Sequence, residues 1–307
     1  MPTNPPNEFY DLEDIQLNYQ PETGYLNSSW GNLGCWLDDT KSPIGNYSQA
    51  CLQLAIELGR LAKLDQLTAG HTILDTGFGC GDQLLVWSNN FAVKQLVGIN
   101  FSHSQTAFAV NVINSRECEA QEGAYLLKQG DCCDPVVWQH VPTALDRVIA
   151  LDCLYHFRNK PVYFKLCHEH LAVDGILAAS DLVLVKPINN LLYKTILKII
   201  CKLSHIPFEN LMTLSSYQAL LAQQGLVLSQ AVNISDKVFL PFGQWLNTYM
   251  LEMKRSHKTD LKLSWIKYKG TAVFLRWAYN KQILDYQLLQ ITQLKNSTNK
   301  AHLAQLL

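Results

Sequence analysis

Short apolar segments alternate with segments of helical periodicity between residues 72 and 181. The apolar segments predict strands at 72–75, 95–100, 124–129, 145–151 and 175–181. The periodic segments predict helices at 83–89, 104–116 and 162–171. Strands that alternate with helices in this way pair in parallel, and the helices cover both faces of the sheet. The expected class is therefore α/β, with a Rossmann-like, doubly wound and mostly parallel sheet.

The rest of the chain divides around this core. Residues 1–47, rich in Asn, Pro, Gly and aromatic side chains, are expected to form an irregular segment with short helices, which we name the lid segment. The main domain is expected to span 48–280. Polar residues after about 281 predict a C-terminal helix and tail at 281–307.

After residue 181 the alternation breaks. A helical cap is predicted at about 187–224, and its first part, 187–209, is expected to lie over a binding site. Strand-like runs at 226–234 and 271–278 bring the expected number of strands to seven, and a helix is predicted at 242–253 between them.

Charge and cysteine content exclude several classes of function. The chain has 25 Lys and Arg against 26 Asp and Glu, so it lacks the basic field that holds nucleic acid. Its nine cysteines are scattered and show no C-x-x-C spacing, which is typical of buried thiols in a reducing cytoplasm and not of a metal site. No secretory leader and no apolar run of about 20 residues is evident. We expect a cytoplasmic protein without a metal.

The strand at 72–75 runs into a turn with three alternating glycines. Asp75 ends the strand, and Gly77, Gly79 and Gly81 follow. A dinucleotide-binding turn, G-x-G-x-x-G, needs another glycine at position 82, where this chain has Asp82. The turn therefore favours a ligand without phosphate, such as S-adenosylmethionine. A tight strand-to-helix turn is the alternative.

The segment from Asp75 to Gly81 resembles the first motif of class I S-adenosylmethionine-dependent methyltransferases, and the resemblance extends over about residues 48–181. It implies that Asp75 orients the ligand amine and that the glycines let the loop pass under the methionine and ribose. The full set that it assigns to S-adenosyl-L-methionine is Trp30, Asp75, Gly77, Gly79, Gly81, Gln83, Asn100, Phe101, Ser102, Gln105, Asp131, Cys132 and Leu151.

Asn100 stands where this family usually has Asp or Glu to accept both ribose hydroxyls. An amide still offers one carbonyl oxygen. The pattern G-I-N-x-S-x-x-Q, which ends at Gln105, is similar to a branch with cyclopropane synthase-like, tocopherol-type and sugar or natural-product O-methyltransferases. Alternatively, Asn100 has no ligand contact and only precedes a helix whose N-cap is Ser102. The resemblance also places Asp131 and the Cys132 amide at the adenine.

The strand at 145–151 leads into the segment that lies beside the sulfonium in the resembling enzymes, where the sequence often reads A-L-E-x-x-x-H-M. Asp152 matches the acid of that pattern and His156 the histidine. A histidine of ordinary pKa suits removal of a proton from a hydroxyl or amine, so His156 is the expected general base and turnover is expected to rise with pH through that pKa. Tyr155 is expected either to position the nucleophile or to face the core. A purely structural histidine is the alternative.

Two further features concern the covers of the site. The lid segment resembles the aromatic lid of this branch, with Tyr25, Trp30 and Trp36 as candidates to cover cofactor or substrate, or else to pack on the core as a strap. Lysines of the cap fall mostly on one side and predict either peripheral contact with an anionic membrane or an exposed basic face. They are Lys186, Lys194, Lys198 and Lys202.

The sequence therefore predicts a methyltransferase that acts on a hydroxyl or amine of a hydrophobic small molecule, either a natural product or a lipid-like compound. The alternatives are a non-catalytic binding module with the same fold and a C-methyltransferase for a lipid-like acceptor. Neither the acceptor nor the oligomeric state follows from the sequence.

Overall fold

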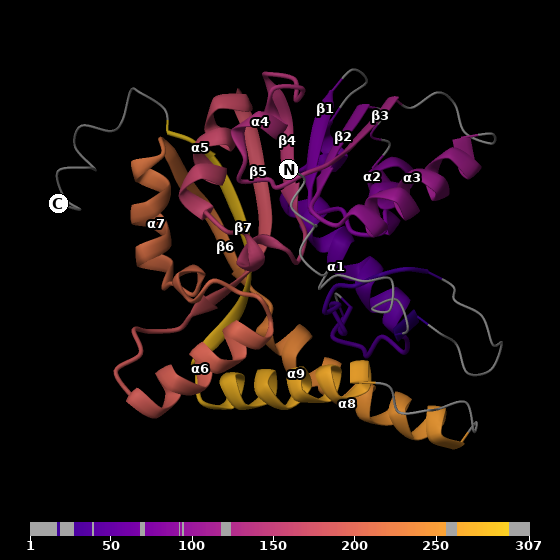
Figure 1. Ribbon diagram of the computed structural model, residues 1–307, viewed down its shortest axis with the longest axis vertical. Helices are drawn as coiled ribbons and strands as arrows, with labels where there is room; N and C mark the ends of the chain where they lie inside the picture. Colours follow the sequence, from indigo (N-terminus) through magenta and orange to yellow (C-terminus); the bar gives the residue numbers. More distant parts are fainter. Residues whose placement is uncertain are drawn as a thin grey trace, which may run out of the picture.

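The computed structural model describes residues 17–18, 28–38, 40–67, 71–91, 93, 95–117, 124–255 and 263–294. One seven-stranded sheet lies between helices, and three further helices lie together at one end of it (Figure 1). The strand order is β3-β2-β1-β4-β5-β7-β6. β7 pairs antiparallel with both of its neighbours, and all other pairs are parallel. The predicted doubly wound, mostly parallel sheet is confirmed.

The elements have the following bounds. The strands are β1 Thr72–Thr76, β2 Gln95–Asn100, β3 Ala124–Gln129, β4 Leu145–Ala150, β5 Leu171–Leu184, β6 Leu226–Asn233 and β7 Leu284–Gln293. The α-helices are α1 Tyr47–Leu61, α2 Asp82–Phe91, α3 His103–Glu117, α4 Pro135–Trp138, α5 Lys160–His170, α6 Leu191–Leu203, α7 Leu214–Gln223, α8 Ser235–Arg255 and α9 Leu263–Asn280. The short 3-10 helices are η2 Leu64–Gln66, η3 Leu154–His156 and η4 Phe208–Asn210.

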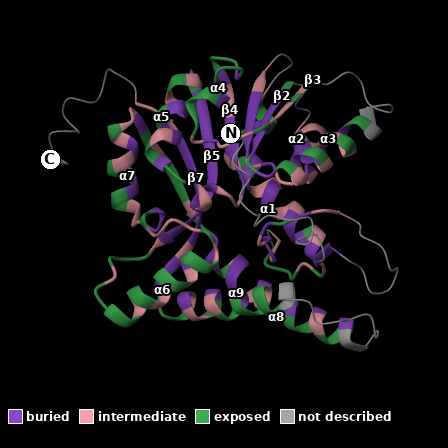
Figure 2. Ribbon diagram, viewed as in Figure 1, coloured by how far each residue is buried: buried purple, intermediate pink, exposed green. Residues whose placement is uncertain are grey.

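Two apolar cores lie on the two faces of the sheet. Helices α1, α2 and α3 cover one face, and α4, α5 and α7 cover the other. Because side chains alternate along a strand, Ile73 of β1 enters the first core and its neighbour Leu74 the second. Figure 2 shows the sheet buried between these layers. Burial on both faces explains why the inner strands β1 and β2 are mostly apolar, whereas the edge strand β3 exposes Leu126.

The cap differs from its predicted composition. It consists of α6, α8 and α9, whereas α7, which was expected within it, packs beside β6 and α5. The strand predicted at 271–278 is wrong, because this segment is part of α9. Ala272, Leu275 and Ala278 are buried at helical spacing, while Val273 and Arg276 between them are exposed.

The C-terminal helix predicted after residue 281 is also wrong over the described part. Residues 284–293 form β7, which lies between β5 and β6. The polar residues that suggested a helix are buried in this strand, and Gln290 Nε2 donates to the Leu61 carbonyl oxygen at 2.6 Å. A buried amide with a backbone partner fits an internal strand. The tail at 295–307 lies outside the described residues.

Candidate active site

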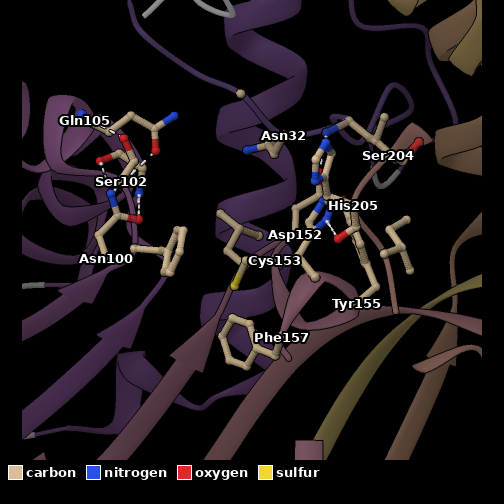
Figure 3. Close-up of a pocket in the computed structure, with 18 of the residues that line it drawn as sticks. Asn32, Asn100, Ser102, Gln105, Asp152, Cys153, Tyr155, Phe157, Ser204 and His205 are labelled. Carbon is tan, nitrogen blue, oxygen red and sulfur yellow. Dashed lines mark hydrogen bonds between the residues drawn. The ribbon is translucent and has the colours of Figure 1, made fainter. Parts of the chain in front are cut away.

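A cavity of about 1040 Å³ opens between the carboxyl ends of the strands and the cap. Open α/β sheets bind ligands at this edge. We name two parts of its wall. The sheet half consists of the loops after β1, β2 and β3 and the start of the loop after β4, and the cap half consists of residues 201–207, Phe242 and residues of α9. Figure 3 shows Asn100, Ser102 and Gln105 on one side and Ser204 and His205 on the other, with Cys153 between them.

The glycine loop after β1 has three left-handed residues, with φ of +81° at Gly77, +58° at Gly79 and +97° at Gly81. A Cβ at Gly77 would lie 2.7 Å from Cys153 Sγ, and one at Gly81 would lie 2.9 Å from the Ala109 Cβ. A Cβ at Gly79 would meet nothing within 4 Å. Gly79 therefore leaves open space on the cavity side, as a loop that cradles a ligand requires. Gly81 packs against α3 and does not line the cavity.

Asp75 is fully buried and does not line the cavity, so its predicted contact with a ligand amine is not found. Its carboxylate accepts from Gln83 Nε2 at 2.8 and 2.9 Å and from Trp87 Nε1 at 2.5 Å. Burial raises the pKa of Asp75 to about 7. Asp75 thus holds Gln83, which does line the cavity, in place.

Asn100 connects the end of β2 with the glycine loop. Its Oδ1 lies 3.4 Å from the Gly79 amide nitrogen, and its Nδ2 lies 3.4 Å from the Gly79 carbonyl oxygen. A carboxylate only accepts hydrogen bonds and could not donate to that carbonyl. The pair of contacts gives a physical reason for an amide where the family usually has an acid. Ser102 caps α3, because its Oγ accepts from the Gln105 amide at 3.3 Å.

The loop after β3 forms the far end of the sheet half. Asp131 and Cys132 line the cavity there, together with Phe101. Arg158, which the sequence analysis did not single out, lies across this end. Its guanidinium carbon is 4.9 Å from the Phe101 ring centroid, and its Nε is 3.7 Å from Asp131 Oδ2. An arginine that stacks on an aromatic ring and approaches a carboxylate can cover a ligand bound beneath it.

Asp152 joins three parts of the chain at the centre of the cavity wall. It has a left-handed backbone, with φ of +53°. Its carboxylate accepts from the Leu33 amide of the lid at 2.7 Å, from the Tyr155 hydroxyl at 2.9 Å and from the Tyr286 hydroxyl of β7 at 2.5 Å. Burial raises the pKa of Asp152, and these donors oppose the rise. Tyr286 was missed because its strand was predicted as a helix.

His156 lies in η3 and lines the cavity, with its ring centroid 4.4 Å from that of Tyr155. Its Nδ1 is 3.4 Å from the His205 carbonyl oxygen. The pKa of His156 is lowered to about 4, mainly by burial; the contact with the His205 carbonyl oxygen opposes this fall, and the nearby charge of Lys267 adds to it. The expectation of an ordinary histidine pKa is therefore wrong. The imidazole is neutral at physiological pH.

A buried network holds η3 against η4 and β5. Asn210 Nδ2 donates to the carbonyl oxygens of Tyr155 and Phe157, at 2.9 and 2.7 Å, and so fixes the backbone on both sides of His156. Lys160 is completely buried, forms an ion pair with Asp181 and donates to the Asn210 carbonyl oxygen at 3.2 Å. Residues of η3 are thereby connected to β5 and η4.

The lid covers the sheet half through Ser29 and Trp30. The Ser29 amide lies 3.1 Å from Asp82 Oδ2, and its hydroxyl donates to the same oxygen. Trp30 lines the cavity. Trp36 does not line it and stacks instead near Trp245, with ring centroids 4.9 Å apart, so the strap alternative holds for this residue. Tyr25 lies outside the described residues.

Most of the predicted residues meet at one cavity. The predicted residues that line it are Trp30, Gly77, Gly79, Gln83, Asn100, Phe101, Ser102, Gln105, Asp131, Cys132, Leu151, Asp152, Tyr155 and His156. Asp75 and Gly81 do not. Residues 201–207 of the cap half fall within the segment that was expected to lie over a binding site, whereas Phe242 and the lining residues of α9 were not predicted. Within the described ranges no group of His, Cys, Asp or Glu could hold a metal ion.

The sheet order, the glycine loop and the cavity at the strand ends define the fold of a class I S-adenosylmethionine-dependent methyltransferase. The model of the mycolic acid cyclopropane synthetase family matches residues 52–268, well over half of the chain. The chain belongs to this family. The predicted resemblance, the enzyme class and the cofactor S-adenosyl-L-methionine are confirmed.

Individual relatives agree with this assignment. Erythromycin 3''-O-methyltransferase from Saccharopolyspora erythraea is 26% identical over 228 residues, which cover 73% of this chain and 69% of the relative. The cyclopropane synthase MmaA2 from Mycobacterium tuberculosis has a TM-score of 0.68 at 14% identity, with 94% of this chain and 100% of that chain covered. Mycolic acid cyclopropane synthase CmaA1, complexed with SAH and CTAB, has a TM-score of 0.69 at 12% identity, covering 92% and 95%. These two structures support the fold.

One further finding concerns membranes. In the part of the chain that the structure describes, no helix is both long and apolar enough to span a bilayer.

Proposed function

We propose that this methyltransferase, which acts on small molecules, transfers a methyl group to a hydroxyl of an apolar acceptor bound in the cap half, with His156 as the general base. The observation that carries the proposal is that His156 lines the cavity and meets the cap half through the His205 carbonyl oxygen, where Leu203, Ile206 and Phe274 also form the wall. The O-methyltransferase named above supports a hydroxyl over an amine or a carbon.

The residues of the sheet half fit S-adenosylmethionine. The open space at Gly79 accommodates a ligand against the backbone, and Asp131 offers a carboxylate oxygen that could accept from an amine. We assign the cofactor contacts to this half, where Asn100 contacts Gly79, Ser102 also lines the cavity and Arg158 lies over the far end. When bound, S-adenosylmethionine supplies an electrophilic methyl group on a sulfonium. The chain's own contribution is to align an acceptor with that group and to exclude water.

His156 is suited to accept a proton for a definite reason. A carbonyl oxygen only accepts hydrogen bonds, so Nδ1 carries the proton in the contact with His205, and Nε2 is the acceptor. Because its pKa is about 4, the ring is in this form throughout the physiological range. A base of such low pKa is weak. We therefore propose that His156 removes the hydroxyl proton while the bond between the acceptor oxygen and the methyl carbon forms, because the proton on that oxygen becomes acidic at that stage.

The experiment is incubation of the purified protein with methyl-labelled S-adenosylmethionine and a metabolite extract, followed by mass spectrometry of the labelled product. We expect an O-methyl ether. A labelled amine would contradict the hydroxyl assignment, and a label on carbon would favour the C-methyltransferase alternative. Another outcome is that the protein binds S-adenosylmethionine in calorimetry and yet gives no labelled product with extracts of diverse origin. That result would favour the non-catalytic binding module.

A further inference from the structure

One face of α9 combines a lysine with apolar side chains at the cavity. The residues of this helix that line the cavity are Lys267, Tyr268, Thr271, Phe274 and Leu275. These positions repeat at the spacing of a single helical face. The side of α9 that faces the cavity therefore offers both an apolar wall and one positive charge.

The end of α6 brings a second lysine to the cap half. Lys202, one of the lysines noted in the sequence of the cap, lines the cavity between Cys201 and Leu203. The chain then turns at His205, whose backbone is left-handed with φ of +51°, and His205 lines the cavity as well. Figure 3 shows Ser204 and His205 on this side of the cavity. Two helices thus each supply an ammonium group to the same half.

Among the described residues, no acid of the cap half balances these charges. The acids that line the cavity are Asp82, Asp131 and Asp152, and they lie in or directly after the loops of the sheet half. Each of these carboxylates accepts hydrogen bonds from neighbouring groups of the protein. Glu209, which follows residues 201–207, does not line the cavity. The cap half is therefore positively charged, although the whole chain has 25 basic and 26 acidic residues.

This charge reaches the reacting centre. Burial is the main cause of the low pKa of His156, and the charge of Lys267 adds to it. An acceptor in the cap half lies in the same field, with the positive sulfonium of the cofactor on its other side. A protonated amine would be repelled from both sides, whereas an anionic group would be attracted by the lysines. The hydroxyls of Ser204 and Thr271 on this wall can also donate to its oxygens.

We propose that the methyl acceptor is an organic anion, whose apolar body lies in the cap half and whose anionic group is held by Lys267 and Lys202. The word acceptor rests on the proposed function, whereas binding of an organic anion in the cap half does not require catalysis. An ammonium group is a compact point charge without the planar fork of a guanidinium. It therefore suits a carboxylate, a sulfonate or a phosphate equally.

Two fluorescent dyes of matched shape test the binding. 1-Anilinonaphthalene-8-sulfonate carries one sulfonate, and N-phenyl-1-naphthylamine is the same molecule without it. In titrations at about 0.05 M NaCl, Lys202→Met/Lys267→Met should weaken binding of the sulfonate about tenfold and leave the affinity for the neutral dye unchanged. Methionine keeps an apolar stem, so the variant removes mainly the charge. Phe274→Ala should weaken both dyes, because it truncates the apolar wall.

The matched control is Lys165→Met on α5, since Lys165 is exposed and does not line the cavity. It should bind both dyes like the wild type. Calorimetry with S-adenosylhomocysteine should give the wild-type affinity for all of these variants, because the cofactor is assigned to the sheet half. Equal losses of both dyes in Lys202→Met/Lys267→Met would overturn the proposal. Unchanged binding of the sulfonate in that variant, or no binding of it by the wild type, would do the same.

The labelled product from the metabolite extract separates this proposal from the proposed function. We expect the product to be retained on an anion-exchange resin at about pH 8, where carboxylates and phosphates are ionised. An O-methyl ether that passes through the resin would overturn the anionic acceptor and leave the proposed function intact. A retained product with its label on nitrogen or carbon would support the anionic acceptor and contradict the hydroxyl assignment.

Discussion

The sheet half and the cap half of the cavity are assembled in different ways. In the sheet half, the glycine loop and Asn100 each follow directly on a strand, and parallel pairing of β1 with β2 brings them together. In the cap half, residues 201–207, Phe242 and residues of α9 come from three helices that only tertiary packing joins. The difference implies that cofactor binding and acceptor binding can be changed separately.

The largest effect is expected at the glycine loop. Gly79→Val should weaken S-adenosylmethionine binding by at least about 100-fold in calorimetry, because a branched side chain fills the open space and disfavours the left-handed backbone. Gly45→Val is the control, since Gly45 also has open space around it but does not line the cavity. If a folded Gly79→Val protein bound S-adenosylmethionine with wild-type affinity, the assignment of the cofactor to the sheet half would be wrong.

His156→Ala should reduce kcat by about 10²–10⁴-fold with unchanged affinity for S-adenosylmethionine. Between about pH 6 and 8, titration of His156 should not change the wild-type kcat. It should fall only as the pH approaches about 4, where the ring gains a proton and loses its acceptor. Exposed His140 provides the matched control, His140→Ala. A rise in kcat through pH 6.5 that is absent from His156→Ala would contradict the lowered pKa.

Asn210→Ala tests whether the position of η3 matters for catalysis, because Asn210 donates hydrogen bonds to the backbone around His156 and does not line the cavity. The loss of donors to two buried carbonyls should lower the free energy of unfolding by about 1–3 kcal/mol. We expect kcat to fall by about tenfold while the affinity for S-adenosylmethionine stays the same. Asn190→Ala removes the N-cap of α6 and should cost about 1 kcal/mol without a change in kcat. Equal kcat losses in both variants would mean that general destabilisation, and not η3, is responsible.

The smallest effect is expected at the far end of the sheet half. Arg158→Ala should weaken S-adenosylmethionine binding by about twofold to fivefold, because an exposed cation over an aromatic ring contributes little. Arg158→Lys should restore part of the affinity. An unchanged dissociation constant in Arg158→Ala would show that Arg158 does not cover the cofactor.

The same contrast explains what could be predicted from the sequence. Strands such as β2 and β3 are local apolar runs, and their bounds were predicted without error. In β7, Gln287 and Gln290 are buried, and the Gln290 amide finds its partner in a distant segment, so the polarity of these residues misleads a local analysis. The apolar run at 271–278 resembles a strand until the burial of Ala272, Leu275 and Ala278 is known. Contacts such as Tyr286 with Asp152 span 134 residues, and no local pattern indicates them.

A crystal structure with S-adenosylhomocysteine tests the division of the cavity most directly. We predict that the ligand lies in the sheet half, against Gly79 and Asn100 and with its adenine near Asp131, and that the cap half stays free for the acceptor. His156 should then face the sulfur from the side of the cap. A ligand bound among His205, Lys267 and Phe274, with the glycine loop uncovered, would contradict the account.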